Sequence, residues 1–357
     1  GLRRALPYAL TGAQERVLAE IDADLVLPNP MLRLVQGDVG SGKTVVAALA
    51  ALRAVEAGYQ AVLMAPTELL AEQHAQNFAR WLDPLDVRCT LLAGRLTGRA
   101  RQQAHAALAS GHTQVAIGTH ALFQQDVRFQ RLALVIIYEQ HRFGVDQRLA
   151  LREKGACEGR FPHQLIMTAT QIPRTLAMTA YADLDVSVID ELPPGRTPVQ
   201  TSVMSEARRN EVVARIHRAC LDGRQVYWVC PLIEESDQLE AQAAEETARS
   251  LSEALPGLEV GLVHGRMPPA AKELTMQRFK AGGIRLLVAT TVIEVGVDVP
   301  NATLMVIENA ERLGLSQLHQ LRGRVGRGLH ASACVLMYLP PLSETAKARL
   351  AVMRDTT

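Results

Sequence analysis

Short apolar runs alternate along the chain with longer amphipathic stretches. The runs are bounded by turn residues and include RLVQ, QAVLMAPT, QVAIGT, ALVII, QLIMTAT, QVYWVCPLI, EVGLVHG, IRLLVATT and ATLMVIENA. Near-continuous apolar runs are typical of strands buried on both faces, and helical stretches between them form the crossovers of parallel sheets. We therefore predict an α/β fold with mainly parallel sheets.

The segment ELPPGRTPV, residues 191–199, interrupts both periodicities with three prolines and a glycine. Such a composition is typical of a stiff linker. We expect an N-terminal domain over residues 1–192 and a C-terminal domain over residues 199–340. Residues 341–357 contain SETAKARLAVMRDTT, which begins with a helix cap and predicts the start of a truncated C-terminal helical element.

Composition narrows the possible functions only slightly. The chain has 357 residues, enough for two or three domains, and its net charge of +1 neither predicts nor excludes a nucleic-acid partner. The five cysteines include no C-x-x-C pair, which indicates a reducing compartment rather than a disulfide framework or a zinc site. No apolar run approaches the roughly 20 residues that span a bilayer, so we expect a cytoplasmic protein without a membrane partner.

The segment GDVGSGKT matches the phosphate-loop pattern G-x-x-x-x-G-K-[ST] and opens the helical stretch TVVAALAALRAVEAG. Gly37, Gly40 and Gly42 allow backbone N–H groups to turn toward phosphate oxygens, and the helix N-terminus adds partial positive charge. Lys43 can reach the terminal phosphates, and the Thr44 hydroxyl can ligate magnesium. The alternative is a glycine-rich strand-to-helix turn with an incidental lysine, which does not account for the complete motif in this context.

The segment HQLRGRVGRG places Arg322, Arg324 and Arg327 among glycines. Solvated helix faces usually alternate lysine and glutamate, whereas glycines between arginines suit guanidinium groups held close to an anion. A solvated charge run is the alternative interpretation. Because the chain also has a phosphate loop, we expect these arginines to stabilise charge on a nucleotide phosphate.

Seven segments follow one another in the order GDVGSGKT, APTELLAEQH, GTHALFQ, EQH, TAT, ATTVIEVGVDVPNA and QLHQLRGRVGRG. The order resembles that of superfamily 2 helicases. The residues of these segments are similar, over essentially the whole chain, to those of bacterial translocases of branched DNA. The resemblance implies two tandem RecA-like P-loop domains with a nucleotide cleft between them. It also implies ATP and Mg²⁺ as cofactors, and a DNA helicase motor that acts on stalled replication forks and Holliday junctions in recombination and repair.

For nucleotide binding, the resemblance assigns roles residue by residue. Gln14, in LTGAQ, corresponds to the glutamine that reads the adenine edge; a helix cap at Thr11 is the alternative, and both can hold together. Lys43 is a phosphate-binding and catalytic residue. Thr44 and Glu139 are the magnesium contacts, and Glu139 is also the carboxylate that activates the attacking water.

Other segments of the first domain resemble those that hold the DNA backbone, although each alone would suit a plain strand-to-helix turn. Their residues are Pro66, Thr67, Gly118, Thr119 and His120. Thr168 and Thr170 resemble the link between hydrolysis and DNA movement. Two hydroxyls at a strand end can form different hydrogen bonds in two nucleotide states, as coupling requires.

In the second domain the implied DNA contacts are His264, Arg266, Thr290 and Thr291. Asp298 resembles a residue that contacts the nucleotide, and Gln320 belongs to the implied coupling set. Arg324 and Arg327 resemble the catalytic arginines that complete the site across the cleft, with Arg327 as the finger. The implied mechanism is that ATP closes the cleft and hydrolysis reopens it, so that alternating backbone grips become directed steps.

The chain departs from the family's Asp-Glu-Gln-His at Tyr138, which precedes Glu139, Gln140 and His141. Tyrosine is a neutral phenol at pH 7 and a poor magnesium ligand, whereas the family's aspartate holds the metal. We therefore expect ATP binding to persist and hydrolysis to be severely weakened. A second departure, Gln171 where the family usually has proline, frees the backbone and loosens the coupling segment.

Other functions remain open from the sequence. The chain could be an ATP-gated DNA-binding module without turnover, or the motor of a transcription-repair coupling factor. A small-molecule P-loop kinase fits less well, because arginines in a second α/β domain have no role in such an enzyme. For the leading interpretation we expect a monomer whose partners are branched double-stranded DNA, forks and single-stranded-DNA-binding protein. The family's N-terminal wedge domain and C-terminal coupling element are expected outside this sequence.

Overall fold

The computed structural model describes residues 2–6, 9–38, 40–92, 98–124, 126–138, 161–169, 184–191, 198–231, 237–290, 299–326 and 331–356. The chain divides into two compact units, Gly1–Pro194 and Gly195–Thr357. The division falls inside the proline-rich segment 191–199. Each unit is built on its own sheet, so each is described by itself.

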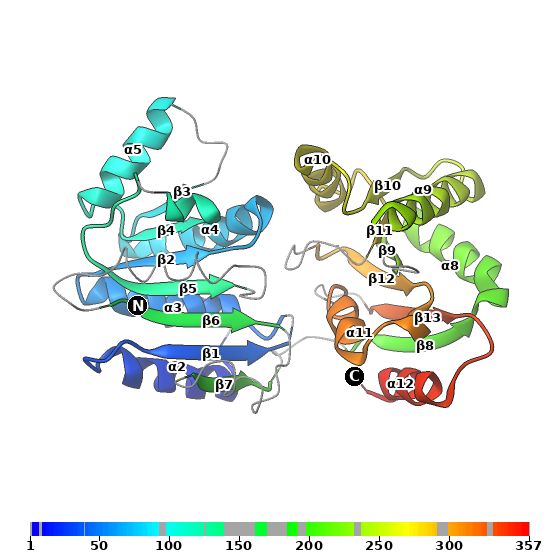
Figure 1. Ribbon diagram of the computed structural model, residues 1–357, viewed down its shortest axis with the longest axis horizontal. Helices are drawn as coiled ribbons and strands as arrows, with labels where there is room; N and C mark the ends of the chain where they lie inside the picture. Colours follow the sequence, from blue (N-terminus) through cyan, green and yellow to red (C-terminus); the bar gives the residue numbers. More distant parts are fainter. Residues whose placement is uncertain are drawn as a thin grey trace. The chain divides into compact units, whose positions relative to one another are not determined.

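Unit 1 is an α/β layer structure on a seven-stranded sheet with the order β3-β4-β2-β5-β6-β1-β7, in which every pair is parallel (Figure 1). The strands are β1 (Leu32–Gly37), β2 (Gln60–Met64), β3 (Cys89–Leu92), β4 (Val115–Gly118), β5 (Leu132–Tyr138), β6 (His163–Thr168) and β7 (Asp185–Ile189). The described helices are α1 (Leu2–Ala5), α2 (Gly12–Leu25), α3 (Lys43–Glu56), α4 (Glu68–Leu82), α5 (Gly98–Ala109) and the 3₁₀ turns η1 (Asp83–Leu85) and η2 (His120–Phe123).

The period of two along β5 decides which side chains meet which helices. Leu134, Ile136 and Tyr138 join the core cluster that includes the inner faces of α2, α3 and α4. Val135 and Ile137 point to the opposite face, into the cluster that contains α5. Tyr138, the last residue of β5, therefore lies on the face covered by α3 and α4.

A buried arginine attaches α2 to the sheet. The Nε atom of Arg33, on β1, donates to Oδ2 of Asp24 at 2.7 Å, and its Nη1 donates to Oγ of Ser187 on β7 at 2.8 Å. Asp24 lies in the last turn of α2. Charge-assisted hydrogen bonds of this kind are stronger than neutral ones, so they fix α2 beside β1, which leads into the phosphate loop.

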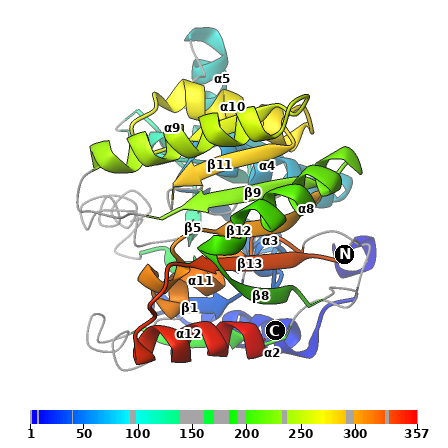
Figure 2. The same ribbon diagram turned by 90° about the vertical axis from the view of Figure 1, so that its right-hand side faces the viewer.

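Unit 2 has a six-stranded sheet with the order β10-β11-β9-β12-β13-β8, again with parallel pairs throughout (Figure 2). The strands are β8 (Gln200–Ser205), β9 (Gln225–Cys230), β10 (Val260–Val263), β11 (Leu286–Thr290), β12 (Ala302–Ile307) and β13 (Ala333–Tyr338). The described helices are α8 (Arg209–Leu221), α9 (Asp237–Ala254), α10 (Pro269–Lys280), α11 (Leu315–Arg322), α12 (Glu344–Asp355) and the 3₁₀ turns η4 (Glu206–Arg208) and η5 (Ala310–Arg312).

An ion pair and an indole N–H connect α8 to the strands of unit 2. Nε1 of Trp228 donates to Oε1 of Glu308 at 2.8 Å, and Arg209, the first residue of α8, pairs with the same carboxylate. The Arg209 guanidinium also lies 4.9 Å from the centre of the Trp228 ring. Trp228 is fully buried, so its fluorescence reports on the core of unit 2.

The last helix begins where the sequence predicts. The Oγ atom of Ser343 accepts a hydrogen bond from the N–H of Ala346 at 3.2 Å, which is the N-cap geometry, and α12 then runs to Asp355. The helix packs against β8 and α11 and counts with unit 2.

The prediction of parallel α/β sheets is confirmed, and each of the nine quoted apolar runs overlaps a strand. Four strands lie outside those runs, namely β3, β7, β8 and β13. Three of them, β3, β7 and β8, are edge strands of their sheets, and their sequences mix polar and apolar residues because one side of an edge strand is less covered. Among the described helices, none is long and apolar enough to cross a membrane.

Candidate nucleotide-binding site

The motifs of unit 1 converge on one edge of its sheet. Because the strands are parallel, their carboxyl ends meet at the same edge, where ligands of open α/β sheets usually bind. The paired residues at this edge are Gln36 and Thr168, Met167 and Tyr138, Ile137 and Met64, and Met64 and Gly118. The phosphate loop follows β1, and the APTELL, GTHALF and TAT segments follow β2, β4 and β6. The structure thus brings together motifs that are distant in sequence.

The phosphate loop has the backbone that its glycines predict. Gly40 and Gly42 both have a φ of 86°, and a Cβ atom on Gly42 would lie only 2.2 Å from Nε2 of Gln14. The helix α3 begins at the next residue, Lys43, so its first N–H groups and partial positive charge adjoin the loop. Nζ of Lys43 donates to the carbonyl oxygens of Gly37 at 2.5 Å and Asp38 at 2.9 Å. This arrangement suits a polyphosphate.

Gln14 connects the start of α2 to the phosphate loop. Its Oε1 accepts from the N–H of Thr11 at 3.0 Å, and Oγ1 of Thr11 accepts from the N–H of Gln14, which makes a complete capping box. Its Nε2 donates to the carbonyl oxygen of Ser41 at 2.8 Å. The helix-cap interpretation is therefore confirmed, while adenine recognition by Gln14 stays a prediction. The bond to Ser41 was not expected from sequence.

Tyr138, at the position where the sequence resemblance predicts an acid, contacts the end of the phosphate loop. Its hydroxyl donates to Oγ1 of Thr44 at 3.1 Å. Its ring packs against the ring of His74, with centroids 4.3 Å apart and planes tilted by 43°. The side chain is only 6% exposed. One tyrosine thus joins β5, α3 and α4 at the site.

His74 is a residue of this site that the sequence did not single out. It lies on the inner face of α4 with Leu70 and Phe78, at a spacing of four residues, so the pattern alone suggested plain core packing. Burial lowers the pKa of His74 to about 3, which leaves the ring neutral. Within the described part of the chain, neither ring nitrogen has a hydrogen-bond partner. Only its adjacency to position 138 reveals the connection with the site.

Among the residues that the structure describes, those at this edge fit the phosphates of a nucleotide but not a magnesium ion. Magnesium prefers carboxylate and water oxygens in a near-ideal octahedron. Thr44, the expected hydroxyl ligand, accepts a hydrogen bond from the Tyr138 hydroxyl, and Tyr138 itself offers a neutral phenol rather than a carboxylate. Among the described residues, no group of three or more His, Cys, Asp or Glu side chains could hold a metal. Glu139 lies outside the described residues.

The predicted DNA-contacting residues of unit 1 lie at the ends of β2 and β4. Thr67 caps α4, since its Oγ1 accepts from the N–H of Leu70 at 3.3 Å. Thr119 is 3% exposed, and its hydroxyl has no hydrogen-bond partner among the described residues. Pro66 is half-buried and Gly118 is buried. Contact of these residues with DNA stays a prediction.

In unit 2 the predicted residues also follow strand ends. His264 follows β10, and its Nε2 lies 3.4 Å from Oε1 of Glu245 on α9. Thr290 ends β11 and is fully buried, whereas Arg266 is exposed. Gln320 is half-buried on α11, and Arg324, just beyond that helix, is buried. Among the described members of this set, Arg266 is the only exposed one.

Arg322 binds groups within unit 2. This corrects the expectation that it stabilises charge on a nucleotide phosphate together with Arg324 and Arg327. Its Nη1 donates to the carbonyl oxygens of Met353 at 3.0 Å and Thr356 at 2.5 Å, at the end of α12, and to Oγ1 of Thr201 at 3.3 Å. These carbonyls belong to the last turn and cap of a helix, where a cation is favourable. Arg322 therefore fastens α12 to α11.

Several expected site residues lie outside the described residues, namely Glu139, Thr170, Gln171, Thr291, Asp298 and Arg327. For His120 the backbone is described and the side chain is not. The roles expected of these residues stay predictions.

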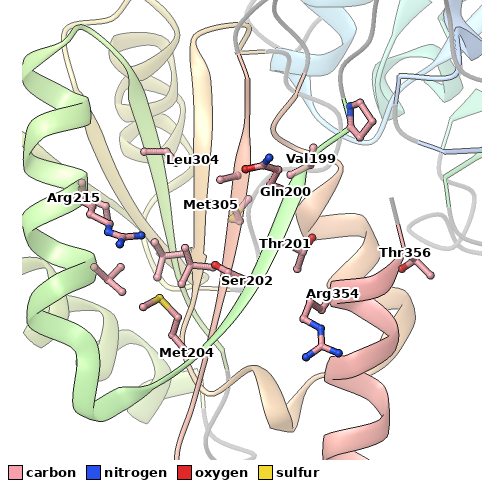
Figure 3. Close-up of a pocket in the computed structure, with 16 residues that line it drawn as sticks. Val199, Gln200, Thr201, Ser202, Met204, Arg215, Leu304, Met305, Arg354 and Thr356 are labelled. Atoms are coloured by element: carbon pink, nitrogen blue, oxygen red, sulfur yellow. The ribbon is translucent and has the colours of Figure 1, made fainter.

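Unit 2 also contains a cavity of about 580 Å³ on the β8 side of its sheet (Figure 3). It lies between β8, α8 and the end of α12, where Arg215, Leu304 and Thr356 contribute to its lining. It includes none of the expected site residues. The cavity is thus separate from the motif-bearing edges.

Family models and relatives agree with this geometry. A DEAD/DEAH box helicase model matches residues 11–179, and a helicase conserved C-terminal domain model matches residues 208–328. The ATP-dependent DNA helicase RecG of Escherichia coli K12 is 67% identical over 356 residues, which cover 99% of this chain and 51% of that protein. RecG of Bacillus subtilis 168 is 50% identical over 354 residues, with the same shares of 99% and 51%. The chain spans about half the length of these relatives.

Solved structures of helicases are also similar to this chain. RecG bound to a three-way DNA junction has a TM-score of 0.86 and 43% sequence identity, and the match covers 100% of this chain and 46% of that chain. Dbp5 of S. cerevisiae bound to RNA and ADP BeF3 has a TM-score of 0.69 at 16% identity, covering 97% of this chain and 87% of that one, which supports the fold alone. From the phosphate loop at the sheet edge and from these matches, the chain is similar over almost its whole length to the RecG helicases.

Proposed function

We propose that this chain is the ATP-dependent motor of a DNA translocase and helicase that acts on branched DNA in recombination and repair. The observation that carries the proposal is the phosphate loop, in which Gly42, Lys43 and the start of α3 meet at the carboxyl edge of a parallel sheet. Relatives named ATP-dependent DNA helicase and a relative bound to a three-way junction support it.

In this proposal, unit 1 holds ATP through the loop N–H groups and Lys43, with Gln14 beside the loop for the adenine. Arg324 and Arg327 serve hydrolysis. The hydroxyl-bearing strand ends of both units contact the DNA backbone without reading sequence, because a motor must pass over any sequence. We also propose that the protein is a monomer and that it has single-stranded-DNA-binding protein as a partner. Its proposed location is the cytoplasm, in association with the nucleoid.

We further propose that Tyr138 impairs ATP hydrolysis in this chain. The position offers a phenol where the reaction needs a carboxylate, and the phenol contacts Thr44 instead. A second candidate function follows from the same observation: a module that binds DNA in a nucleotide-gated manner without turnover. The high identity to RecG favours the branched-DNA motor over a transcription-repair coupling motor.

The test uses the 357-residue chain carrying Tyr138→Asp and a forked DNA substrate. We expect ATP hydrolysis that forked DNA stimulates, and loss of that hydrolysis when Lys43→Ala is added, since Lys43 adjoins the loop carbonyls. Fork binding that responds to ATP while Tyr138→Asp fails to hydrolyse it would favour the nucleotide-gated module. Hydrolysis without any response to DNA would contradict both.

A further inference from the structure

Three side chains from three elements meet at the end of the phosphate loop: Thr44 of α3, His74 of α4 and Tyr138 of β5. We infer that Tyr138 engages the Thr44 hydroxyl and thereby makes nucleotide binding by this chain independent of magnesium. The inference rests on the proposed binding of ATP by unit 1. It goes further in naming the ligand as the metal-free nucleotide and Tyr138 as the cause.

The Thr44 hydroxyl oxygen, which could ligate a metal, is already a hydrogen-bond acceptor. A threonine hydroxyl has two lone pairs on Oγ1 through which it could ligate a metal, and here one of them accepts the hydrogen bond of the Tyr138 hydroxyl, with 3.1 Å between the two oxygens. A metal at Thr44 would have to use the remaining lone pair of Oγ1, directly beside the hydroxyl of Tyr138. The phenol would then be a neutral neighbour of a dication, with none of the charge that a carboxylate supplies.

The position of Tyr138 is fixed. Its side chain is 6% exposed and belongs to the core cluster that contains Ile136 and Met167. The ring lies against His74, whose side chain is buried on the inner face of α4. Protein cores are close-packed, so the ring cannot swing out without opening α4 from the sheet. The bond to Thr44 is therefore a constant feature of the site.

Tyr138 does not satisfy the hydrogen-bonding groups of its neighbour His74. Buried polar atoms normally have hydrogen-bond partners, yet both ring nitrogens of His74 have none among the described residues. The tyrosine presents ring carbons to the imidazole at this distance. A carboxylate at position 138 would offer an acceptor to a His74 N–H and a free Thr44 hydroxyl to a metal. The tyrosine thus leaves a buried imidazole without a hydrogen bond among the described residues.

The remaining contacts bind phosphate without a metal. Lys43 supplies a full positive charge beside the loop, and the start of α3 supplies N–H donors and the positive end of the helix dipole. None of these groups depends on Thr44. An ATP molecule that carries no metal keeps all of them as partners.

The experiment measures the Kd of ATP by calorimetry for the 357-residue chain, once with excess Mg²⁺ and once with EDTA. For the unsubstituted chain we expect the two Kd values to agree within about twofold, because position 138 offers the metal a neutral phenol and no carboxylate. Tyr138→Asp should bind ATP at least about tenfold more tightly with Mg²⁺ than with EDTA. In EDTA it should bind more weakly than the parent, because the carboxylate repels the phosphates.

Tyr138→Phe is the matched control, since it keeps the ring against His74 and removes only the hydroxyl that reaches Thr44. We expect it to show a Mg²⁺ dependence between those of the parent and Tyr138→Asp. Thermal unfolding of each variant establishes that it is folded. Binding by the parent chain that is tenfold tighter with Mg²⁺ would overturn this inference alone, while no binding in either buffer would overturn the proposed nucleotide site and the inference with it.

Discussion

The hydroxyl of Tyr138 donates a hydrogen bond to Oγ1 of Thr44, although the two residues are 94 positions apart in sequence. The contact joins the end of the fifth strand to the residue that follows the phosphate-loop lysine. It arises because the period of two along β5 points Tyr138 toward the face on which α3 begins. The substitution expected to weaken the metal site therefore also engages the hydroxyl of that site.

His74 should make unit 1 sensitive to acid. The pKa of His74 is lowered by burial from 6.5 to about 3, so the folded state binds a proton less readily than the unfolded state. The associated stability is complete above pH 6.5 and is lost as the pH falls toward 3, at up to about 1.4 kcal/mol per pH unit. His74→Leu should flatten this dependence and leave the free energy of unfolding at pH 7 unchanged or higher.

The measurement is urea unfolding of the parent and His74→Leu at pH 7, 6 and 5, followed through Trp81. The chain has two tryptophans, and Trp81 lies in unit 1 while Trp228 lies in unit 2, so a Trp228→Phe background isolates unit 1. His112→Leu, at an exposed histidine of the same unit, is the control. Parallel pH profiles for the parent and His74→Leu would contradict the account of His74.

Gln14 should stabilise the phosphate loop as well as α2. Gln14→Ala removes both the donor to Ser41 and the acceptor for Thr11, and we expect a loss of about 1–3 kcal/mol in the free energy of unfolding of unit 1. Gln14→Glu keeps the acceptor and removes the donor, so it separates the two bonds. We expect both variants to weaken ATP binding, and Gln103→Ala, on the exposed side of α5, to leave it unchanged.

If Gln14→Glu bound ATP as tightly as the parent, the bond from Gln14 to the Ser41 carbonyl would have no part in shaping the loop. Calorimetry with ATP and unfolding followed through Trp81 give the two quantities on the same variants.

Arg322 should hold α12 on unit 2. Arg322→Ala leaves the carbonyls of Met353 and Thr356 without their shared donor, and we expect unit 2 to lose about 2–4 kcal/mol of stability. Arg322→Lys should recover part of the loss, because one ammonium cannot reproduce the planar fork. Unfolding followed through Trp228 measures the effect.

The control for Arg322 is Arg354→Ala, since Arg354 is an exposed residue of α12 whose only described ion pair is with its neighbour Asp355. A Trp228 transition that Arg322→Ala leaves unmoved would contradict the fastening role. The Trp81 transition should not respond to either variant.

The sequence was sufficient for the central strands and the phosphate loop, because both depend on local pattern: continuous apolar runs for β5 or β11, and glycines with positive φ at the loop. Edge strands such as β7 were not predicted, because half-covered strands contain polar residues and their sequences therefore resemble those of loops. Tyr138 was recognised as a departure from the sequence alone. Its bond to Thr44 was not, since nothing local specifies which helix residue a strand end will meet.

The same reason explains His74 and Arg322. The pattern of α4 makes His74 one more inward residue, and its significance comes from Tyr138, which only the tertiary fold brings to it. Arg322 looks like its neighbours Arg324 and Arg327 in a glycine-rich segment, and only the position of α12 distinguishes it.

The most direct measurement is the rate of ATP hydrolysis by the parent chain and by Tyr138→Asp, side by side, with saturating forked DNA and Mg²⁺. The account predicts that the parent hydrolyses ATP at least about tenfold more slowly than Tyr138→Asp, because the metal-holding carboxylate is replaced by a phenol that contacts Thr44. Lys43→Ala in each background gives the rate without a working phosphate loop. Equal DNA-stimulated rates for the parent and Tyr138→Asp, both well above the Lys43→Ala rate, would contradict it.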